Sequence, residues 1–384
     1  MTLGAISRPG ERDRLMVKLG HIDWTFCLLL TAIAGVGGLV LYSIAGGAWS
    51  PWAARHLTLF GVCFVLMVGL ATVDVRAWFA LAYPLYGLSL LMLLAVPVMG
   101  HATMGARRWL DLGPIRLQPS EMIKVGLVLA LARFYHGLDV NRARLSWRLL
   151  IPAAMIGIPA ALVAHQPDLG TAILIATTGG AIMLLAGLSL RLTTALLAAL
   201  AGLAPIAFLF VLKSYQKARL LTFLNPEADR SGSGYHIIQS KIALGSGGLL
   251  GKGFGLGTQS QLNFLPEKST DFIFASMAEE FGFVGCVTVL ALYAAVIFLG
   301  LRMASTAHSH FARLAASGVI VGFALCVLIN GAMVMGLAPV VGVPMPLLSF
   351  GGTVMITMMA GFALVLSAKV HRYSEVASGR GAFF

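Results

Sequence analysis

Several ionisable side chains of this sequence lie at the ends of long apolar runs, where a charge is costly and therefore indicates a function. In the segment QPSEMIK, residues 118–124, Glu121 and Lys124 are three residues apart and share one face of a helix. Pro119 and Ser120 directly before them are typical of a helix start. We interpret the two charges as a bifunctional patch at the membrane rim; the alternative is an ordinary charge pair at a helix start.

Two aspartates each stand where an apolar run begins. Asp271, in the segment LPEKSTDFIFASMAEEFG at 265–282, lies beside a cationic loop, and a carboxylate on a rigid helix at the rim is suited to act as a general base. Asp168, in the segment HQPDLGT at 165–171, follows a tight turn between two apolar runs. Either aspartate can instead serve only as the N-terminal cap of its helix.

Two further carboxylates follow Asp271 on the same predicted helix. Glu279 and Glu280 lie about 12–14 Å deeper than Asp271 at the helical rise of about 1.5 Å per residue. A carboxylate at that depth must be paired, protonated or directed to a polar cavity.

The basic residues are concentrated in two segments between apolar runs. The segment 213–270 contains Lys213, Lys217, Arg219, Arg230, Lys241, Lys252 and Lys268, and the segment 99–119 contains Arg107, Arg108 and Arg116. Because Lys and Arg bind phosphate groups well, we interpret both segments as an anion-binding face, with a solvated loop surface as the alternative.

Two glycine- and proline-rich segments interrupt the apolar pattern. In APVVGVPMPLLSFGGT at 338–353, the prolines forbid a regular helix, so we expect a partly embedded loop. Ser349 and Thr353 can line a cavity there, although packing is the alternative role. The segment GSGGLLGKGFGLG at 245–257 lacks the strand–helix context of a dinucleotide motif and is interpreted as close-packed or mobile backbone.

The elements that must position these residues are membrane helices. The 384 residues are 58% hydrophobic and 11% charged, whereas a soluble domain has about 25% charged residues. Apolar runs near the ~20 residues needed to cross a bilayer recur along the chain. We therefore expect an all-α integral membrane protein with about ten transmembrane helices, at 24–46, 52–73, 78–98, 120–136, 149–165, 169–187, 192–212, 271–301, 314–336 and 351–369.

An even number of spans places both termini on the same side. Lys and Arg near 1–18, 142–148, 302–313 and 369–380 predict that this side is the cytoplasm, so that 213–270 is one long extracytoplasmic loop. Residues 1–384 are expected to form a single polytopic domain, in which 1–23 is a cytoplasmic tail without the features of a cleavable signal peptide. The stretch 12–22 is amphipathic, which is compatible with an interfacial helix or with an ordinary tail.

The motifs together resemble one known family, called SEDS for shape, elongation, division and sporulation. The resemblance covers about residues 12–372, and within the family it favours the RodA-like elongation branch over the division branch, FtsW. The segments that carry it are ARRWLDLG, QPSEMIK, HQPDLGTA, FLNPEADRSGSGYHIIQSKIALGSGGLLGKG, GTQSQLNFLPEKSTDFIFA, AEEFG and PVVGVPMPLLSFGGT.

The resemblance implies a peptidoglycan glycosyltransferase that polymerises lipid II, the disaccharide-pentapeptide on undecaprenyl pyrophosphate, at the outer face of the bacterial cytoplasmic membrane. It implies a class B penicillin-binding protein, a transpeptidase, as partner, beside other membrane proteins of the elongation complex and no nucleic acid. Asp271 matches the family's catalytic aspartate, and Trp109, Glu121 and Lys124 match positions needed for activity.

The expected reaction is an inverting transfer in which Asp271 accepts the proton of the attacking hydroxyl. The leaving pyrophosphate needs cations, for which Arg107, Arg108, Lys124, Lys217, Arg219 and Lys241 are the candidates. A divalent cation, Mg²⁺ or Mn²⁺, is a further candidate, although no metal ligands are identified. Trp109 is expected to support a sugar face or to anchor the chain at the interface.

Two other functions compete with this one. A flippase for the same lipid-linked precursor would explain Glu279 and Glu280 as part of a translocation path, but it should have ionisable groups near the bilayer midplane and on both sides. A non-catalytic membrane scaffold of the elongation machinery predicts that replacement of Asp271 has no effect.

Overall fold

The computed structural model describes residues 11–103, 106–112, 115–138, 149–189, 207–229 and 232–376, with isolated residues between 191 and 205. The α-helices of this part are α1 (Glu11–Gly20), α2 (Trp24–Ile44), α3 (Ala53–Ala71), α4 (Val75–Met99), α5 (Pro119–His136), α6 (Leu150–His165), α7 (Leu169–Leu185), α9 (Ser214–Leu224), α10 (Ser233–Ser246), α11 (Thr258–Gln261), α12 (Ile273–Ser305), α13 (His310–Val334) and α14 (Gly352–Val370). A π-helical turn, Ala207–Val211, and a 3₁₀ turn, Pro226–Ala228, precede and follow α9.

The helices confirm an all-α, multi-pass membrane protein. Six of them in the described part are long and apolar enough to cross a membrane: α2, α3, α4, α12, α13 and α14. The apolar helices α6 and α7 are shorter, with 16 and 17 residues. α5 has 18 residues but carries Glu121, Lys124 and Arg133, so its composition is less apolar. The predicted span 192–212 lies mostly outside the described residues, as do Arg142, Arg144, Arg148 and Arg230.

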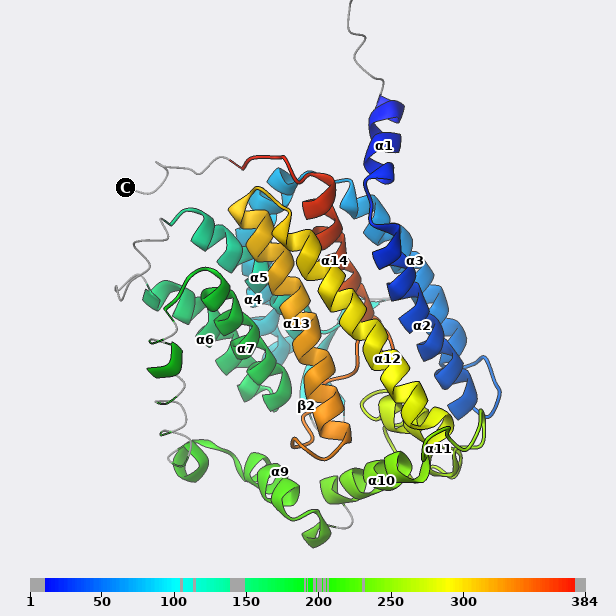
Figure 1. The fold of residues 1–384 in the computed structure, drawn as a ribbon. Helices are drawn as coiled ribbons and strands as arrows, with labels where there is room; N and C mark the ends of the chain where they lie inside the picture. Colours follow the sequence, from blue (N-terminus) through cyan, green and yellow to red (C-terminus); the bar gives the residue numbers. More distant parts are fainter. Residues whose placement is uncertain are drawn as a thin grey trace, which may run out of the picture.

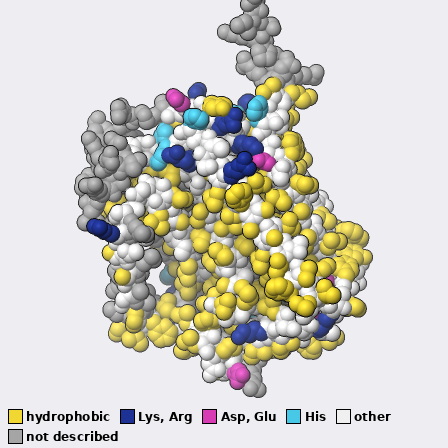
Figure 2. All heavy atoms as spheres, in the orientation of Figure 1, with side chains coloured by type: hydrophobic (Ala, Val, Ile, Leu, Met, Phe, Trp, Pro, Cys, Tyr) yellow, Lys and Arg dark blue, Asp and Glu magenta, His cyan; other side chains and the backbone are white. Residues whose placement is uncertain are grey.

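Both ends of the described chain lie at one end of the helical bundle, near α1 and the end of α14 (Figure 1). Figure 2 shows Lys, Arg and His side chains gathered at this end and a broad band of hydrophobic side chains below it. This distribution agrees with a cytoplasmic location of both termini under the positive-inside rule. The opposite end, with α9, α10 and α11, is then the outer end (Figure 1).

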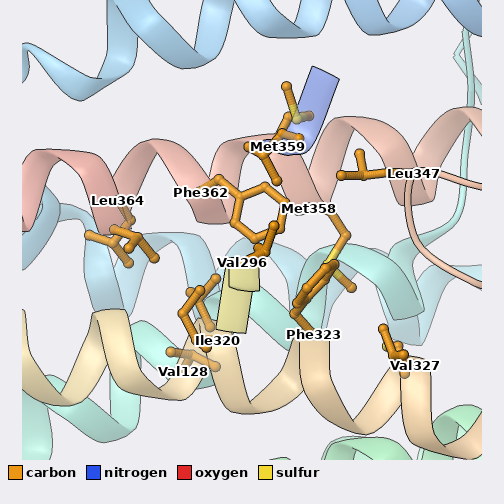
Figure 3. Close-up of a cluster of buried hydrophobic side chains, with 14 of the residues drawn as sticks. Val128, Val296, Ile320, Phe323, Val327, Leu347, Met358, Met359, Phe362 and Leu364 are labelled. Carbon is orange, nitrogen blue, oxygen red and sulfur yellow. The ribbon is translucent and has the colours of Figure 1, made fainter. Parts of the chain in front are cut away.

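The centre of the bundle is a packed apolar core between α12, α13 and α14. Phe323 of α13 and Phe362 of α14 meet edge to face at 5.1 Å, and Val296 of α12 lies beside them (Figure 3). A Cβ atom on Gly361 would lie 2.9 Å from Val319, so the missing side chain allows α13 and α14 to approach closely. Small residues at such crossings are typical of membrane helices.

The outer end of the bundle contains regular secondary structure. The segment 99–119 forms a small antiparallel sheet of three strands, β1 (His101–Thr103), β2 (Ala106–Leu112) and β3 (Ile115–Leu117), in the order β1-β2-β3. The long segment 213–270 contains three helices, α9, α10 and α11. The sequence does not reveal these elements, because the strands are too short to show a clear period-2 pattern and the helices are only partly apolar.

The glycine-rich segment is close-packed against a kink in α12 at Gly282 (φ +64°). A Cβ atom on Gly251 (φ +82°) would lie 2.0 Å from the carbonyl oxygen of Glu280. The backbone of this segment also pairs with α12, since Gly253 N donates to Glu280 O at 3.1 Å and Phe283 N donates to Gly248 O at 2.9 Å. Only glycine allows this approach.

Candidate active site

Asp271 is fixed in place through its backbone. Asn330 of α13 donates from Nδ2 to the carbonyl oxygens of Asp271 and Val343, both at 2.8 Å. Ser349 donates from Oγ to the carbonyl oxygen of Thr270 at 2.7 Å. One amide and one hydroxyl therefore join the start of α12 to the proline-rich loop before α14.

Asp271 does not cap α12. The N-cap position is Phe272, and no side-chain capping bond is made there. Within the described residues the Asp271 carboxylate has no hydrogen-bond partner. It lies beside Gly342, since a Cβ atom added to that glycine would be 3.5 Å from Asp271 Oδ2. The cap interpretation of Asp271 is therefore wrong, and its carboxylate is available for chemistry.

The surroundings raise the basicity of Asp271. Burial raises the pKa of Asp271 to about 6, and the nearby carboxylates of Glu267 and Asp168 act in the same direction. Arg108 and Arg219 oppose this effect but do not cancel it. A carboxylate with a pKa near 6 is mostly ionised at neutral pH and still holds a proton well enough to act as a general base.

Arg108 and Asp168 form the second part of the site. Arg108 Nη1 lies 3.8 Å from Asp168 Oδ2, while Nε donates to Gln166 O at 3.4 Å and Nη2 donates to Pro167 O. Asp168 is 4% exposed, and its Oδ1 accepts from Thr171 N at 3.3 Å. Asp168 thus caps α7, which confirms the capping role that the sequence predicts as one alternative, and it also faces Arg108, an arginine close to Asp271.

Glu121 and Lys124 form a buried ion pair on α5. Lys124 Nζ lies 2.8 Å from Glu121 Oε2, which confirms that the two share one helix face. Lys124 also interacts electrostatically with Asp168, so the charges run from Glu121 through Lys124 and Asp168 to Asp271. The bundle therefore brings three of the predicted site segments together.

The remaining predicted bases divide into two groups. Arg219 on α9 donates from Nη1 to Val340 O at 3.5 Å and acts electrostatically on Asp271, so it belongs to the site. Arg107 is exposed and donates to Pro97 O at 3.1 Å. It points away from Arg108, because successive side chains of β2 point to opposite faces of the sheet. Trp109 is half-buried opposite His101 in the sheet.

Two lysines of the outer helices lie outside this charge cluster. Lys217 on α9 donates from Nζ to Leu209 O at 2.9 Å. Lys241 on α10 is exposed and lies against Gly336 after the end of α13. Neither contacts the residues around Asp271 that are named above.

The two predicted hydroxyls of the proline-rich loop bond to backbone. Ser349 accepts from Met345 N at 2.9 Å besides donating to Thr270 O. Thr353 donates from Oγ1 to Arg116 O at 3.3 Å and so joins α14 to β3. These contacts favour the packing role over direct substrate contact.

Glu279 and Glu280 support the glycine-rich segment rather than a path through the membrane. Glu279 Oε1 lies 2.6 Å from Lys252 Nζ and accepts from Thr258 Oγ1 at 2.9 Å. Glu280 accepts from the hydroxyl of Ser43 on α2. Both carboxylates are therefore engaged at the outer end of α12.

Sequence reasoning missed two residues of the site. Asn330 is the single amide within the apolar run 314–336, and an amide in such a run is a recognisable signal. Glu267 stands in the segment that also carries Asp271, but its electrostatic influence depends on the turn between them. In the part of the chain that the structure describes, no three His, Cys, Asp or Glu side chains are grouped so as to hold a metal.

Two similar proteins from different bacteria have the same name, peptidoglycan glycosyltransferase MrdB. The chain is 45% identical to the peptidoglycan glycosyltransferase MrdB of Escherichia coli (strain K12) over 352 residues, 92% of this chain and 94% of that protein. It is 38% identical to MrdB of Helicobacter pylori (strain J99) over 298 residues, 76% of each chain.

Solved structures have the same fold. A chain from a study of the structural coordination of polymerization and crosslinking by a peptidoglycan synthase complex matches with a TM-score of 0.79 and 36% identity, over 92% of this chain and 98% of that one. The rod shape determining protein RodA of Thermus thermophilus matches with a TM-score of 0.69 and 31% identity, over 92% and 98%. The family model described as the cell cycle protein FTSW_RODA_SPOVE matches residues 24–374, and the chain belongs to that family.

Proposed function

We propose that this protein is a peptidoglycan glycosyltransferase that polymerises lipid II at the outer face of the cytoplasmic membrane during cell elongation. The observation that carries the proposal is Asp271, a carboxylate with a pKa near 6 at the outer end of a membrane helix, beside Arg108 and Arg219. The names of the relatives and the family membership support the same activity.

The reaction joins two lipid-linked units. A hydroxyl of the acceptor sugar attacks the anomeric carbon of the donor, a new C–O bond forms, and the bond to the pyrophosphate breaks with inversion through a transition state that resembles an oxocarbenium ion. Asp271 accepts the hydroxyl proton, and the polyprenyl pyrophosphate leaves with the bonding electrons. Arg108 and Arg219 stabilise the charge that develops on the pyrophosphate.

The place of the site follows from the substrate. A polyprenyl tail stays in the bilayer, while its sugar and peptide stay in water, so the reacting atoms must lie at the rim of the bundle. Asp271 stands there, two residues before Ile273, the first residue of the apolar helix α12.

The partners and cofactors of this function are proposals of the same kind. A class B penicillin-binding protein is the expected transpeptidase, since a structural relative comes from a complex that coordinates polymerization and crosslinking. A Mg²⁺ or Mn²⁺ ion is a candidate cofactor. Mg²⁺ usually binds through one or two carboxylates and the phosphates of a substrate, so Asp271 or Asp168 can supply its protein ligand.

The test is polymerisation of lipid II by the purified protein in nanodiscs, with and without the transpeptidase. We expect glycan polymer from the natural protein and none from Asp271→Asn, whose folding is checked by size exclusion and thermal unfolding. Polymer from both proteins would refute the base role of Asp271. Absence of polymer from the folded, partner-bound protein, together with transfer of lipid II across the bilayer, would support the flippase instead.

A further inference from the structure

A cavity lies at the outer end of the bundle, and Asp271, Arg108 and Arg219 are not among the residues that line it. It has a volume of about 320 Å³, within the range of roughly 300–1,000 Å³ that small-molecule sites occupy. Trp52, Gln261, Asn263 and Lys268 line it, together with the turn after α2. We call it the Trp52–Lys268 pocket. Figure 1 shows the outer end of α2 beside α11, at the same end of the bundle as α10.

Lys268 brings a buried positive charge to this pocket. Lys268 is 8% exposed, and its Nζ donates to Ser260 O and to Asn263 Oδ1, both at 2.7 Å. The Trp52 ring centroid is 6.0 Å from the same atom. All of these partners are uncharged. Among the described residues, no carboxylate lies within ion-pair distance of Lys268.

This arrangement leaves the charge of Lys268 without compensation. A buried charge is costly unless it is paired, and burial lowers the pKa of the Lys268 ammonium accordingly. An ammonium has three N–H donors, of which two are used within the described part of the chain. A purely structural brace between Ser260 and Asn263 needs only a neutral donor, so a cation that faces a cavity indicates an anionic ligand.

The other lining groups narrow the class of anion. An indole and two side-chain amides suit the apolar faces and hydroxyls of a polyhydroxylated headgroup, as Trp52, Gln261 and Asn263 provide here. Lys is a strong binder of phosphate, and the pocket lies at the outer end of the bundle, where the apolar helix α2 ends. The ligand chemistry is therefore a phosphate-bearing headgroup of a membrane lipid.

The location relative to Asp271 suggests which lipid. Lys268 and Asp271 are three residues apart, so their Cα atoms are at most about 11 Å from each other. Polymerisation joins two lipid-linked units, and each of them carries a pyrophosphate. The pyrophosphate of the donor leaves beside Arg108 and Arg219. The acceptor keeps its pyrophosphate, which is separated from the attacking hydroxyl by one or two sugar rings and needs cations of its own.

We propose that the Trp52–Lys268 pocket is this second phosphate subsite, which holds the pyrophosphate of one lipid-linked substrate while the other substrate reacts beside Asp271. The proposal rests on the proposed function. It assigns to Lys268 a binding role rather than a part in the chemical step.

The first test counts bound substrate without turnover. The Asp271→Asn protein in neutral detergent is given a short-tailed lipid II, and native mass spectrometry counts the bound molecules. We expect two per protein, and one after Lys268→Met is added. Ala45→Phe fills the pocket from the end of α2 without removing the bonds of Lys268, so it should have the same effect even if Lys268→Met unfolds. Two bound molecules in both variants would overturn the proposal.

The second test uses the active protein in phosphatidylcholine nanodiscs. Lys268→Met should raise the KM for lipid II roughly tenfold to a hundredfold, the effect of losing a charge-assisted hydrogen bond, with a smaller change in kcat. Lys268→Arg should recover part of the loss. Arg302→Met, which removes an exposed cation at the cytoplasmic end of α12, is the matched control and should have no effect.

The two sources of such a headgroup are then separated. For this purpose phosphatidylglycerol is added to the detergent sample of the first test. If Lys268→Met reduces bound phosphatidylglycerol in the mass spectra but leaves both lipid II molecules in place, the pocket is a phospholipid site and the substrate assignment is wrong. Failure of the proposed function has a different signature: the Asp271→Asn protein binds two lipid II molecules in the first test, but the natural protein forms no polymer in the second.

Discussion

A general base acts only in its deprotonated form, so the activity of this protein should depend on the pKa of the Asp271 carboxyl group. With a pKa of about 6, the rate at low substrate should rise roughly tenfold per pH unit below pH 6 and level off above it. The contribution of this group to folding has the opposite sign, because its stabilisation is complete below pH 3.8 and is lost as the pH rises through 6. Initial rates of polymerisation between pH 4.5 and 8, in buffers of equal ionic strength at about 0.15 M, measure the profile; a flat profile would contradict the base role.

Glu121 and Lys124 should be strongly coupled. Glu121 is 3% exposed, so Glu121→Gln leaves a buried ammonium unpaired and should lower the free energy of unfolding by about 3–5 kcal/mol. The double variant Glu121→Gln with Lys124→Met removes both charges and should be more stable than the single one. Unfolding in mild detergent by heat or denaturant gives the three values.

Simple additivity of the two substitutions would show that the pair is not coupled in the folded protein. Lys18→Met, near the cytoplasmic end, is a suitable control, since within the described part of the chain its ammonium donates only to the carbonyl oxygen of Thr72.

At the scale of elements, the attachment of α13 to the start of α12 should matter for catalysis. Asn330→Leu removes the two bonds that hold the carbonyls of Asp271 and Val343, and we expect at least a tenfold loss of kcat with folding retained. The pH profile should also shift, because the carboxylate loses its fixed position. Thr288→Val is the control and should behave like the natural protein, because Thr288 is exposed and its hydroxyl donates to the carbonyl oxygen of Val284 in the same helix.

The kink in α12 requires glycine. Gly282→Ala places a Cβ atom 2.3 Å from Gly251 N at a φ of +64°, so it should displace the glycine-rich segment and lower both the melting temperature and the activity. Gly87→Ala in α4 meets open space and should be neutral or stabilising by up to about 1 kcal/mol. Equal effects of the two substitutions on thermal unfolding would contradict this account.

The sequence predicts the membrane helices well because apolar length is a local property, and nine of the ten expected spans match helices in the described part of the chain. It also predicts the shared face of Glu121 and Lys124, since helical spacing alone determines it. The sequence does not predict whether Arg107 or Arg108 lies near Asp271. The answer depends on which face of β2 each side chain occupies, and the pairing of β2 with β1 and β3 determines this. The roles of Asn330 and Ser349 likewise depend on contacts between distant parts of the chain.

For the whole molecule, the arrangement of the bundle predicts which positions face which side of the membrane. Leu249, 72% exposed in the glycine-rich segment, should become reactive from outside the cell when it is replaced by Cys. Ser305→Cys, exposed at the opposite end of α12, should react only after permeabilisation. Labelling with a membrane-impermeant maleimide is the measurement, in a background without the four native cysteines. The reverse pattern would invert the orientation.

The backbone attachment of Asp271 has a consequence for how this protein can be studied. Asn330 and Ser349 bind main-chain oxygens, so the start of α12 keeps its position whatever side chain stands at 271. Truncation by Asp271→Gly should therefore leave a void of carboxylate size in an intact scaffold rather than a collapsed loop. Formate or acetate supplied from solution can enter such a void, and a small diffusible acid would then restore turnover in a saturable way, as chemical rescue.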